Sequence, residues 1–275
     1  MNTPPVKKLF FCDLDGTLLT PDCKLSPENY AAIGELRARG ILLIPCSGRC
    51  FAEIPSALVS HPAVELMVLS NGACVMHSKT GETVMRFSMP PEEHLFLYDL
   101  QQKAVSSELF HEAGRVYCDR HKFMNHTEYG INQYTYDALI HTTILLDSFD
   151  EKRRAAEFLD MSVACFRDKE AFDAYTACVA ADGRFSYTTS TSGGLEVMHG
   201  GISKGATLRH VAELYGIPLA DTLAAGDSHN DTTMFAAVGY SMATANADED
   251  VRAAADRIIC KNSEHILPYI LANVL

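Results

Sequence analysis

Long apolar runs are missing from the sequence, and none approaches the roughly 18 uncharged residues that a membrane-spanning helix needs. The apolar stretch near the N-terminus is interrupted at Asp13, so it does not form the hydrophobic region of a signal peptide. Internal repeats and low-complexity tracts are also absent. We therefore expect a cytoplasmic protein that has no membrane partner.

The sequence has fewer basic than acidic residues. The chain carries 23 Lys and Arg against 35 Asp and Glu, a formal net charge of -12. A chain this acidic has no general attraction to polyanions, so we expect no nucleic-acid partner. The same count, taken alone, also disfavours a phosphate-bearing ligand. The apolar content of 47% excludes disorder over most of the chain.

The sequence also lacks the spacing of a disulfide or zinc framework. Its nine cysteines are an odd number, with no C-x-x-C pair and no Cys/His grouping at zinc spacing. We therefore expect reduced thiols. An alternative zinc site would have to use four poorly spaced histidines, His111, His121, His126 and His141.

Short apolar runs alternate with helical patterns at both ends of the chain. Strands are predicted for residues 9–12, 41–44, 66–69, 222–225, 240–243 and 257–260. Helices are predicted for residues 27–39, 51–59, 203–215 and 232–237. Alternating strands and helices are typical of a parallel sheet that is covered by helices, so the fold class is α/β.

The middle of the chain has a different pattern, with frequent aromatic residues and histidines and less regular strands. We predict an inserted α+β domain at residues 85–187, within a discontinuous α/β core of residues 1–84 and 188–275. The Ser/Thr/Gly-rich residues 188–194 are the predicted hinge at which the chain returns to the core.

Acidic motifs follow two of the predicted core strands. The motif D-L-D-G-T occupies residues 13–17, and G-D-S-H-N-D occupies residues 226–231. In an open parallel sheet, ligands bind at the carboxyl ends of the strands, where the strand order reverses. We therefore expect Asp13 and Asp227 to be neighbours. The second motif suits a hard cation such as Mg²⁺, although Asx or capping turns are an alternative for both motifs.

Two further patches are weak signals on their own. The motif S-G-R at residues 47–49 offers a small hydroxyl and backbone N–H groups before a helix, which suits phosphate oxygens. Lys204 lies in G-G-I-S-K-G at residues 200–205, without P-loop spacing. A lone lysine is more typical of a solvated surface charge, so neither patch defines a site without the acidic motifs.

Together these motifs resemble the haloacid dehalogenase superfamily, and specifically its Cof-type phosphatases with a large inserted cap of class IIB. The resemblance also includes S-N-G-A at residues 70–73 and L-E-V…K-G at residues 195–205, and it covers essentially the whole chain. Two stretches depart from the family pattern. Residues 243–245 read A-T-A where relatives have a tighter turn, and residues 261–265 lack the usual Asp-Gly.

The resemblance implies a Rossmann-like three-layer core and a Mg²⁺-dependent phosphatase. It implies that Asp13 is the nucleophile, which forms an aspartyl-phosphate, and that Asp15 is the general acid and base. It further implies that Mg²⁺ is held by Asp13, the backbone carbonyl of Asp15 and Asp227.

The resemblance also implies the phosphate contacts, through Ser47, Gly48, Lys204 and Asn230. Asp231 is expected to orient these groups without itself contacting the phosphate or the metal. A bound cation and Lys204 would attract an anion locally whatever the net charge, so the surface charge excludes polyanions but not a small phosphorylated substrate.

The expected substrates are small phosphorylated metabolites, either sugar phosphates or a phosphorylated cofactor. Two alternatives belong to other classes: a phosphomutase similar to phosphomannomutase, and a non-catalytic phosphate-binding module. The sequence makes no prediction of the oligomeric state, and it does not identify which residues of the inserted domain select the substrate.

Overall fold

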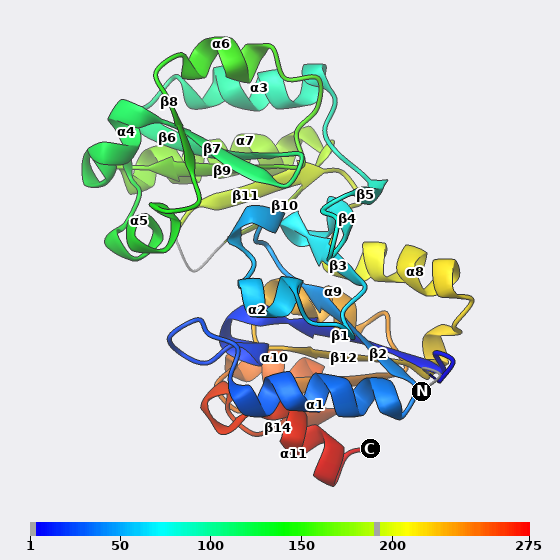
Figure 1. Cartoon of the computed structure of the whole chain (residues 1–275). Coiled ribbons are helices and arrows are strands. Elements are labelled where there is room, and N and C mark those ends of the chain that lie inside the picture. The colour runs from blue at the N-terminus through cyan, green and yellow to red at the C-terminus, as the bar shows by residue number, and fades with distance from the viewer. Residues whose placement is uncertain (1–3, 190–192) are drawn as a thin grey trace. The chain divides into compact units, whose positions relative to one another are not determined.

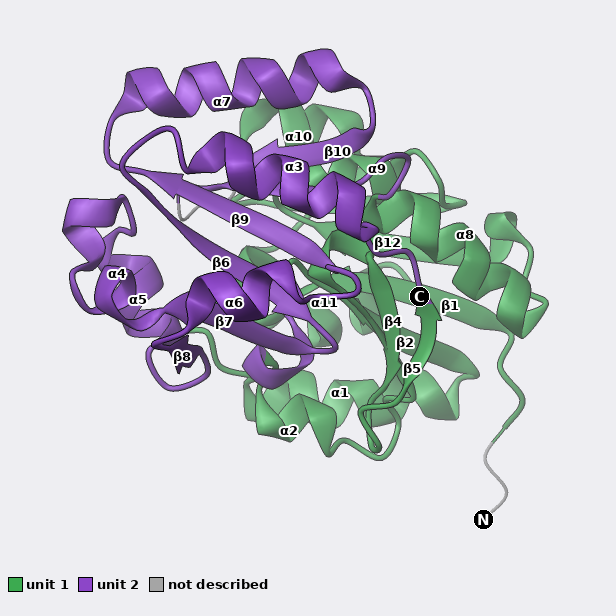
Figure 2. Cartoon of the chain, turned by 90° about the horizontal axis from the view of Figure 1, so that it is seen from above, with its two compact units in different colours: residues 1–48, 54–85, 203–275 green, residues 49–53, 86–202 purple. Residues whose placement is uncertain are grey.

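The computed structural model describes residues 4–189 and 193–275, and the chain divides into two compact units. Unit 1 contains residues 1–48, 54–85 and 203–275, and unit 2 contains residues 49–53 and 86–202 (Figure 2). The predicted hinge at residues 188–194 includes residues 190–192, which lie outside the described residues. Within the described ranges, no helix is both long and apolar enough to cross a membrane.

Unit 1 is built on an eight-stranded sheet. Its strands, in spatial order, are β14 (Arg257–Ile259), β13 (Tyr240–Thr244), β12 (Thr222–Gly226), β1 (Lys8–Asp13), β2 (Ile41–Cys46), β3 (Leu66–Leu69), β4 (Cys74–His77) and β5 (Thr83–Arg86). The pairings from β14 to β3 are parallel, and β4 pairs with β3 in the antiparallel direction. All the predicted strands occur, and the α/β fold class is confirmed.

Helices cover both faces of this sheet. They are α1 (Pro27–Ala38), α2 (Ser56–Val59), α8 (Lys204–Tyr215), α9 (Thr232–Phe235), α10 (Glu249–Ala254) and α11 (Ile266–Asn273). Apolar residues of α8, α9 and α10 share one core with Phe11 and Leu42 of the sheet, whereas α1 and α11 lie together on the other side (Figure 1). The central strands β1 and β2 are buried along almost their whole length, as strands covered on both faces must be.

The predicted helix over residues 51–59 is wrong. The structure has a 3₁₀ turn at Phe51–Glu53 and a separate short helix, α2. Pro55 lies between them with ψ near 129°, outside the helical region. Proline has no backbone N–H to donate and its ring restricts the residue before it, so the helix cannot continue through this position.

Unit 2 has a six-stranded sheet. Its strands, in spatial order, are β10 (Phe185–Thr189), β11 (Leu195–His199), β9 (Met161–Phe166), β6 (Ser106–Glu112), β7 (Arg115–Asp119) and β8 (Ile144–Leu146). Its helices are α3 (Pro91–Gln101), α4 (Arg120–Met124), α5 (Gln133–Leu139), α6 (Phe149–Arg154) and α7 (Lys169–Asp182). Residues of α3, α6 and α7 form one apolar core with the strands, around Phe110 and Val197.

The predicted domain boundaries and the boundaries of the compact units differ by one residue at Met85, and by more than one residue at two other places. Unit 2 extends to Ile202, because β11 pairs with both β9 and β10 in antiparallel fashion. Residues 49–53 also belong to unit 2, where the backbone N–H of Ala52 donates to the carbonyl of Gly114 at 3.0 Å.

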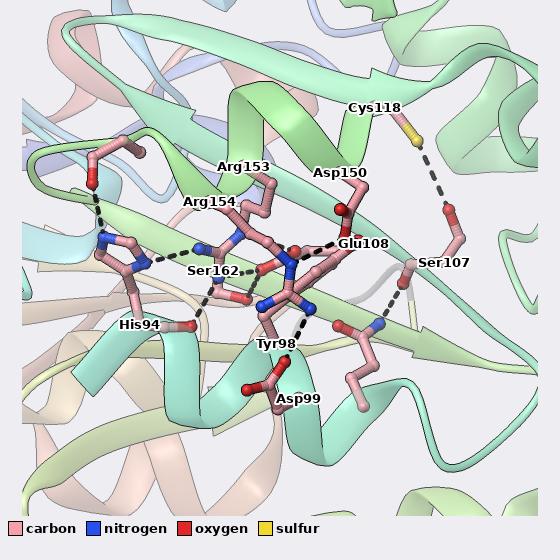
Figure 3. Close-up of polar contacts among 12 residues, drawn as sticks. His94, Tyr98, Asp99, Ser107, Glu108, Cys118, Asp150, Arg153, Arg154 and Ser162 are labelled. Carbon is pink, nitrogen blue, oxygen red and sulfur yellow. Dashed lines mark hydrogen bonds and ion pairs between the residues drawn. The ribbon is translucent and has the colours of Figure 1, made fainter. Parts of the chain in front are cut away.

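The core of unit 2 contains a fully buried arginine (Figure 3). Arg153 of α6 donates hydrogen bonds to both carboxylate oxygens of Glu108, at 2.8 and 2.9 Å, and to the ring and backbone of His94. Burial and the neighbouring Arg153 lower the pKa of His94 to about 4, so its ring is neutral and can accept a hydrogen bond. One buried positive charge is thus matched by one buried negative charge.

Candidate active site

The two acidic motifs meet at the carboxyl ends of β1 and β12, as the sequence predicts. Asp13 is the last residue of β1, and Asp227 directly follows β12. The two strands pair in parallel with Cys12 opposite Ala225, so both aspartates leave the same edge of the sheet. The strand order reverses at β1, and the site therefore lies where parallel α/β sheets bind ligands.

Lys204 lies inside this cluster of aspartates and is only 1% exposed. It is the first residue of α8, whose N-terminus is capped by Ser203, and the Ser203 side chain accepts a hydrogen bond from Ala206 N–H at 3.1 Å. Lys204 Nζ lies 2.7 Å from Asp13 Oδ1 and 2.7 Å from Asp231 Oδ1. The pattern of a solvated surface lysine therefore does not apply here.

Asp231 is completely buried, and both of its carboxylate oxygens are held by protein groups. Oδ1 contacts Lys204, and Oδ2 accepts hydrogen bonds from the backbone N–H groups of Asp227 and Ser228, each at 3.0 Å. The contacts with Ser228 form a capping box at the turn His229–Asp231. Asp231 thus fixes both Lys204 and the loop that carries Asp227.

The turn after β1 brings Thr17 and Gly16 against Asp227. Thr17 Oγ1 donates a hydrogen bond to Asp227 Oδ1 at 3.0 Å. Gly16 has a φ of +78°, and a Cβ at this position would lie 2.2 Å from Asp227 Oδ2. Only glycine therefore allows this turn and this carboxylate to approach so closely.

Negative charge is in excess at this site. Burial raises the pKa of Asp13 well above its ordinary value, Asp231 raises it further, and Lys204 opposes the change. Burial and Asp231 also raise the pKa of Asp227, to about 6. Burial alone would lower the pKa of Lys204, but Asp13 and Asp231 outweigh burial and raise it. One ammonium group therefore faces three carboxyl groups.

The donor set fits a hard divalent cation. Asp13, Asp227 and Asp231 offer carboxylate oxygens within 4.8 Å of one another. Asp231 is already bonded through both oxygens, which leaves Asp13 and Asp227 as the better ligands. A divalent cation at this place would offset the buried negative charge of these carboxylates, and carboxylate oxygens are the ligands that Mg²⁺ prefers.

The remaining predicted residues lie on neighbouring loops of unit 1. Ser47, which is 2% exposed, and Gly48 directly follow Cys46, the register partner of Asp13 in the β1–β2 pair. Asp15 is half-buried in the turn after β1, with φ −77° and ψ 124°. The structure thus gathers all the predicted residues at one end of the sheet.

Asn71 is a site residue for which the sequence reasoning assigned no role. Its Oδ1 accepts a hydrogen bond from Asn230 Nδ2 at 3.1 Å, and its φ of +53° places it in the left-handed region. Asn230 Oδ1 is buried and has no hydrogen-bond partner among the described residues. The sequence feature that could have identified Asn71 is the motif at residues 70–73. This motif directly follows β3, just as the acidic motifs follow β1 and β12.

Thr17 was missed as the partner of Asp227, and Asn246 as a support for Gly16. Asn246 Nδ2 donates to the carbonyl of Gly16 at 2.8 Å, close to one of the two departures from the family pattern. Thr244, inside that departure, lies 3.5 Å from the same carbonyl through its Oγ1. This stretch therefore still supports the turn that carries Asp15.

Comparison with known proteins agrees with this geometry. A family profile described as haloacid dehalogenase-like hydrolase matches residues 10–271. Phosphatase YwpJ of Bacillus subtilis is 25% identical over 299 residues, covering 98% of this chain and 100% of the relative. The HMP-PP phosphatase of Escherichia coli O6:H1 is 27% identical over 243 residues, covering 88% of this chain and 85% of the relative.

Solved structures share the fold. The subclass IIB sugar phosphatase BT4131 superposes with a TM-score of 0.80 at 21% identity, covering 97% of this chain and 98% of that structure. The chain therefore belongs to the haloacid dehalogenase-like hydrolase family, as a phosphoric monoester hydrolase.

Proposed function

We propose that this protein is a Mg²⁺-dependent phosphatase that hydrolyses small phosphorylated metabolites through an aspartyl-phosphate on Asp13. The observation that carries the proposal is the contact of Lys204 with Asp13, at the end of β1 and beside Asp227. This arrangement combines a nucleophile, a fixed positive charge and oxygen ligands for a cation, which are the parts that phosphoryl transfer needs.

In the first step, the Asp13 carboxylate attacks phosphorus and the bond to the ester oxygen breaks. The leaving alkoxide takes a proton from Asp15, which lies two residues further along the same turn. In the second step, Asp15 takes a proton from water, the water oxygen attacks phosphorus, and Asp13 and inorganic phosphate are released. Two displacements thus replace one difficult step.

Lys204 has two roles in this proposal. Its ammonium group lowers the pKa of Asp13, against the effect of burial, and so favours the ionised nucleophile. The same charge stabilises the phosphoryl oxygens together with Ser47, Gly48 and Asn230. Because Asp231 and Asp13 hold Lys204 from two sides, its charge is already in position before substrate binds.

Asp13, Asp227 and the backbone carbonyl of Asp15 are the proposed ligands of Mg²⁺. When bound, Mg²⁺ supplies positive charge that offsets the carboxylates and the phosphoryl oxygens. Thr17 orients Asp227 for this purpose through its hydrogen bond to Oδ1.

The proposed substrates are sugar phosphates or a phosphorylated cofactor. Relatives named as an HMP-PP phosphatase and a sugar phosphatase support this class. The net charge of -12 favours small substrates over polyanions. We propose that the inserted domain, which corresponds to unit 2, selects among them as a cap.

The test is the release of inorganic phosphate from an aryl phosphate, with Mg²⁺ and after removal of the metal with EDTA. The parent protein should be active only with the metal, and Asp13→Asn should be inactive. Asp22→Asn is the matched control, since it removes one exposed carboxylate that is paired with Lys24 and does not belong to the aspartate cluster. Activity that survives Asp13→Asn, or that is insensitive to EDTA, would overturn the mechanism. Isomerisation of a hexose phosphate without hydrolysis would favour the phosphomutase.

A further inference from the structure

A second group of metal-binding side chains lies within unit 2. It consists of Cys50, Glu53 and His111, whose ligand atoms all lie within 4.8 Å of one another. Cys50 and Glu53 belong to the segment around the 3₁₀ turn Phe51–Glu53, and His111 belongs to β6. The group shares no residue with the aspartate cluster of unit 1.

The three side chains are shielded from solvent. Cys50 is 0% exposed and His111 is 4% exposed, and the side chain of Glu53 is 8% exposed. Glu53 Oε2 accepts a hydrogen bond from Cys50 N–H at 2.6 Å and lies 3.8 Å from His111 Nε2. The donors therefore already converge on one small volume.

The backbone around these side chains is also held in place. Arg49 donates a hydrogen bond to the carbonyl of Glu53 at 2.8 Å, and Ala52 N–H donates to the carbonyl of Gly114 in the turn after β6. The segment is thus fixed against the strand that carries His111, so the ligands do not have to be ordered by a metal. Preorganised ligands reduce the entropy lost on binding.

Glu53 is the acidic member of this group, and its side chain is 8% exposed. A carboxylate that is almost fully buried needs a compensating positive charge. A divalent cation held by Cys50, Glu53 and His111 would supply this charge.

We propose that Cys50, Glu53 and His111 form a second metal site, which binds Zn²⁺ or a similar borderline divalent ion. Thiolate sulfur, imidazole nitrogen and carboxylate oxygen together are a ligand set typical of Zn²⁺ and unsuited to Mg²⁺. On binding, the Cys50 thiol loses its proton to solvent and its sulfur bonds to the metal. One divalent cation, one thiolate and one carboxylate then give a neutral buried complex.

The site links the segment after Gly48 to β6 of unit 2. Its metal would hold residues 50–53 against that strand. The inference does not depend on the proposed function, because no residue of the aspartate cluster takes part.

The test is a titration of the metal-free, reduced protein with Co²⁺, which reports cysteine ligation by a thiolate-to-cobalt charge-transfer band. The parent protein should develop this band, and Zn²⁺ should displace Co²⁺ and abolish it. Cys50→Ser should remove the band, whereas Cys165→Ser should retain it, because Cys165 is a buried cysteine of β9 outside the group. Glu53→Gln and His111→Gln should keep the band but weaken Co²⁺ binding at least about tenfold.

Circular dichroism and phosphate release from an aryl phosphate show whether each variant is folded. Absence of the band in the parent protein would overturn the proposal, and so would a band of unchanged intensity in folded Cys50→Ser. If Cys50→Ser does not fold, the Glu53→Gln and His111→Gln titrations decide: unchanged Co²⁺ affinity in both variants contradicts the site, and weakened affinity in both supports it.

Discussion

Arg153 in unit 2 and Lys204 in unit 1 are both buried basic side chains that contact acidic groups, and the charge around the two differs. In unit 2, Arg153 is matched by Glu108 alone, and the neighbouring His94 is neutral. In unit 1, Lys204 contacts Asp13 and Asp231, and Asp227 lies close by. The first arrangement is electrically balanced, and the second has an excess of negative charge.

This difference separates a structural network from a reactive one. A buried ion pair with no net charge and with all its hydrogen bonds made helps to define how the core packs. It leaves no charged group available for reaction. Burial, together with the neighbouring Asp231, raises the pKa values of Asp13 and Asp227, and the excess of carboxyl groups creates an attraction for a cation. Perturbed carboxyl groups at the ligand-binding edge of a sheet therefore indicate function, whereas burial of charge alone does not.

The largest expected effect is on catalysis, from Lys204→Met. In the proposed mechanism the Lys204 charge both stabilises the phosphoryl oxygens and keeps Asp13 ionised, so its loss should lower kcat/KM at least about 10³-fold. The acid limb of any residual activity should move to higher pH, since the pKa of Asp13 rises without Lys204. The measurement is the pH profile of aryl phosphate hydrolysis, with Lys204→Arg as the variant that retains the charge. An unshifted profile would contradict this role.

The next largest effect is on stability, from Arg153→Met. Removing the buried cation leaves Glu108 uncompensated, which should lower the free energy of unfolding by about 3–5 kcal/mol. Urea denaturation measures this loss, and the exposed neighbour Arg154 provides a control whose change to Met should cost no more than about 1 kcal/mol.

Adding Glu108→Gln to Arg153→Met should recover part of the stability, because the unpaired charge is then removed as well. Hydrolysis by folded Arg153→Met should stay within a few-fold of the parent. If Arg153→Met and Arg154→Met lowered the free energy of unfolding equally, the buried Arg153–Glu108 pair would contribute no more to stability than the exposed ion pairs of Arg154.

The third effect is a pH dependence of the stability of the metal-free protein, measured as its free energy of unfolding. Burial raises the pKa of Asp227 from 3.8 to about 6, so between these values the native state binds more protons than the unfolded chain. Stability contributed by this group is therefore present below about pH 4 and is lost as pH rises through about 6, on the order of 3 kcal/mol. Urea denaturation in EDTA from pH 4 to 7.5 measures it, and Asp227→Asn should flatten the dependence. Mg²⁺ should oppose the loss at high pH.

The smallest effect is expected from Thr17→Val, which keeps the shape of the side chain but removes the hydrogen bond to Asp227. Mg²⁺ activation should need about tenfold more metal, because the ligand is less well oriented. A titration of activity against Mg²⁺ concentration measures this. An identical activation curve would show that Asp227 is held in place without Thr17.

The sequence predicted the core of unit 1 because hydrophobic periodicity and strand ends carry most of that information. Apolar runs predict β1 and β12, and the rule for parallel sheets predicts Asp13 beside Asp227, in agreement with the register of these two strands. Lys204 was different. Its sequence pattern alone is typical of a surface lysine, and only the family resemblance assigned it to the site.

Other features depended on long-range pairing that the sequence does not show. The extension of unit 2 to Ile202 follows from the pairing of β11 with β9, whereas the composition of residues 188–194 alone predicts the boundary there. The group of Cys50, Glu53 and His111 was missed because zinc spacing was sought locally, whereas the register of β6 brings His111 to it. Of the four histidines considered at first, His121 and His126 instead lie against the rings of Tyr129 and Tyr136.

The capping box at Asp231 has a consequence for mutational screens of this protein. One carboxylate fixes the start of a turn with one oxygen and a buried lysine with the other. A library selected for activity would therefore reject most substitutions at this position, and a library selected for abundance would reject many of the same ones. Position 231 would then resemble a catalytic residue in the first screen and a folding residue in the second, and only purified variants assayed at matched folded concentration could separate the two contributions.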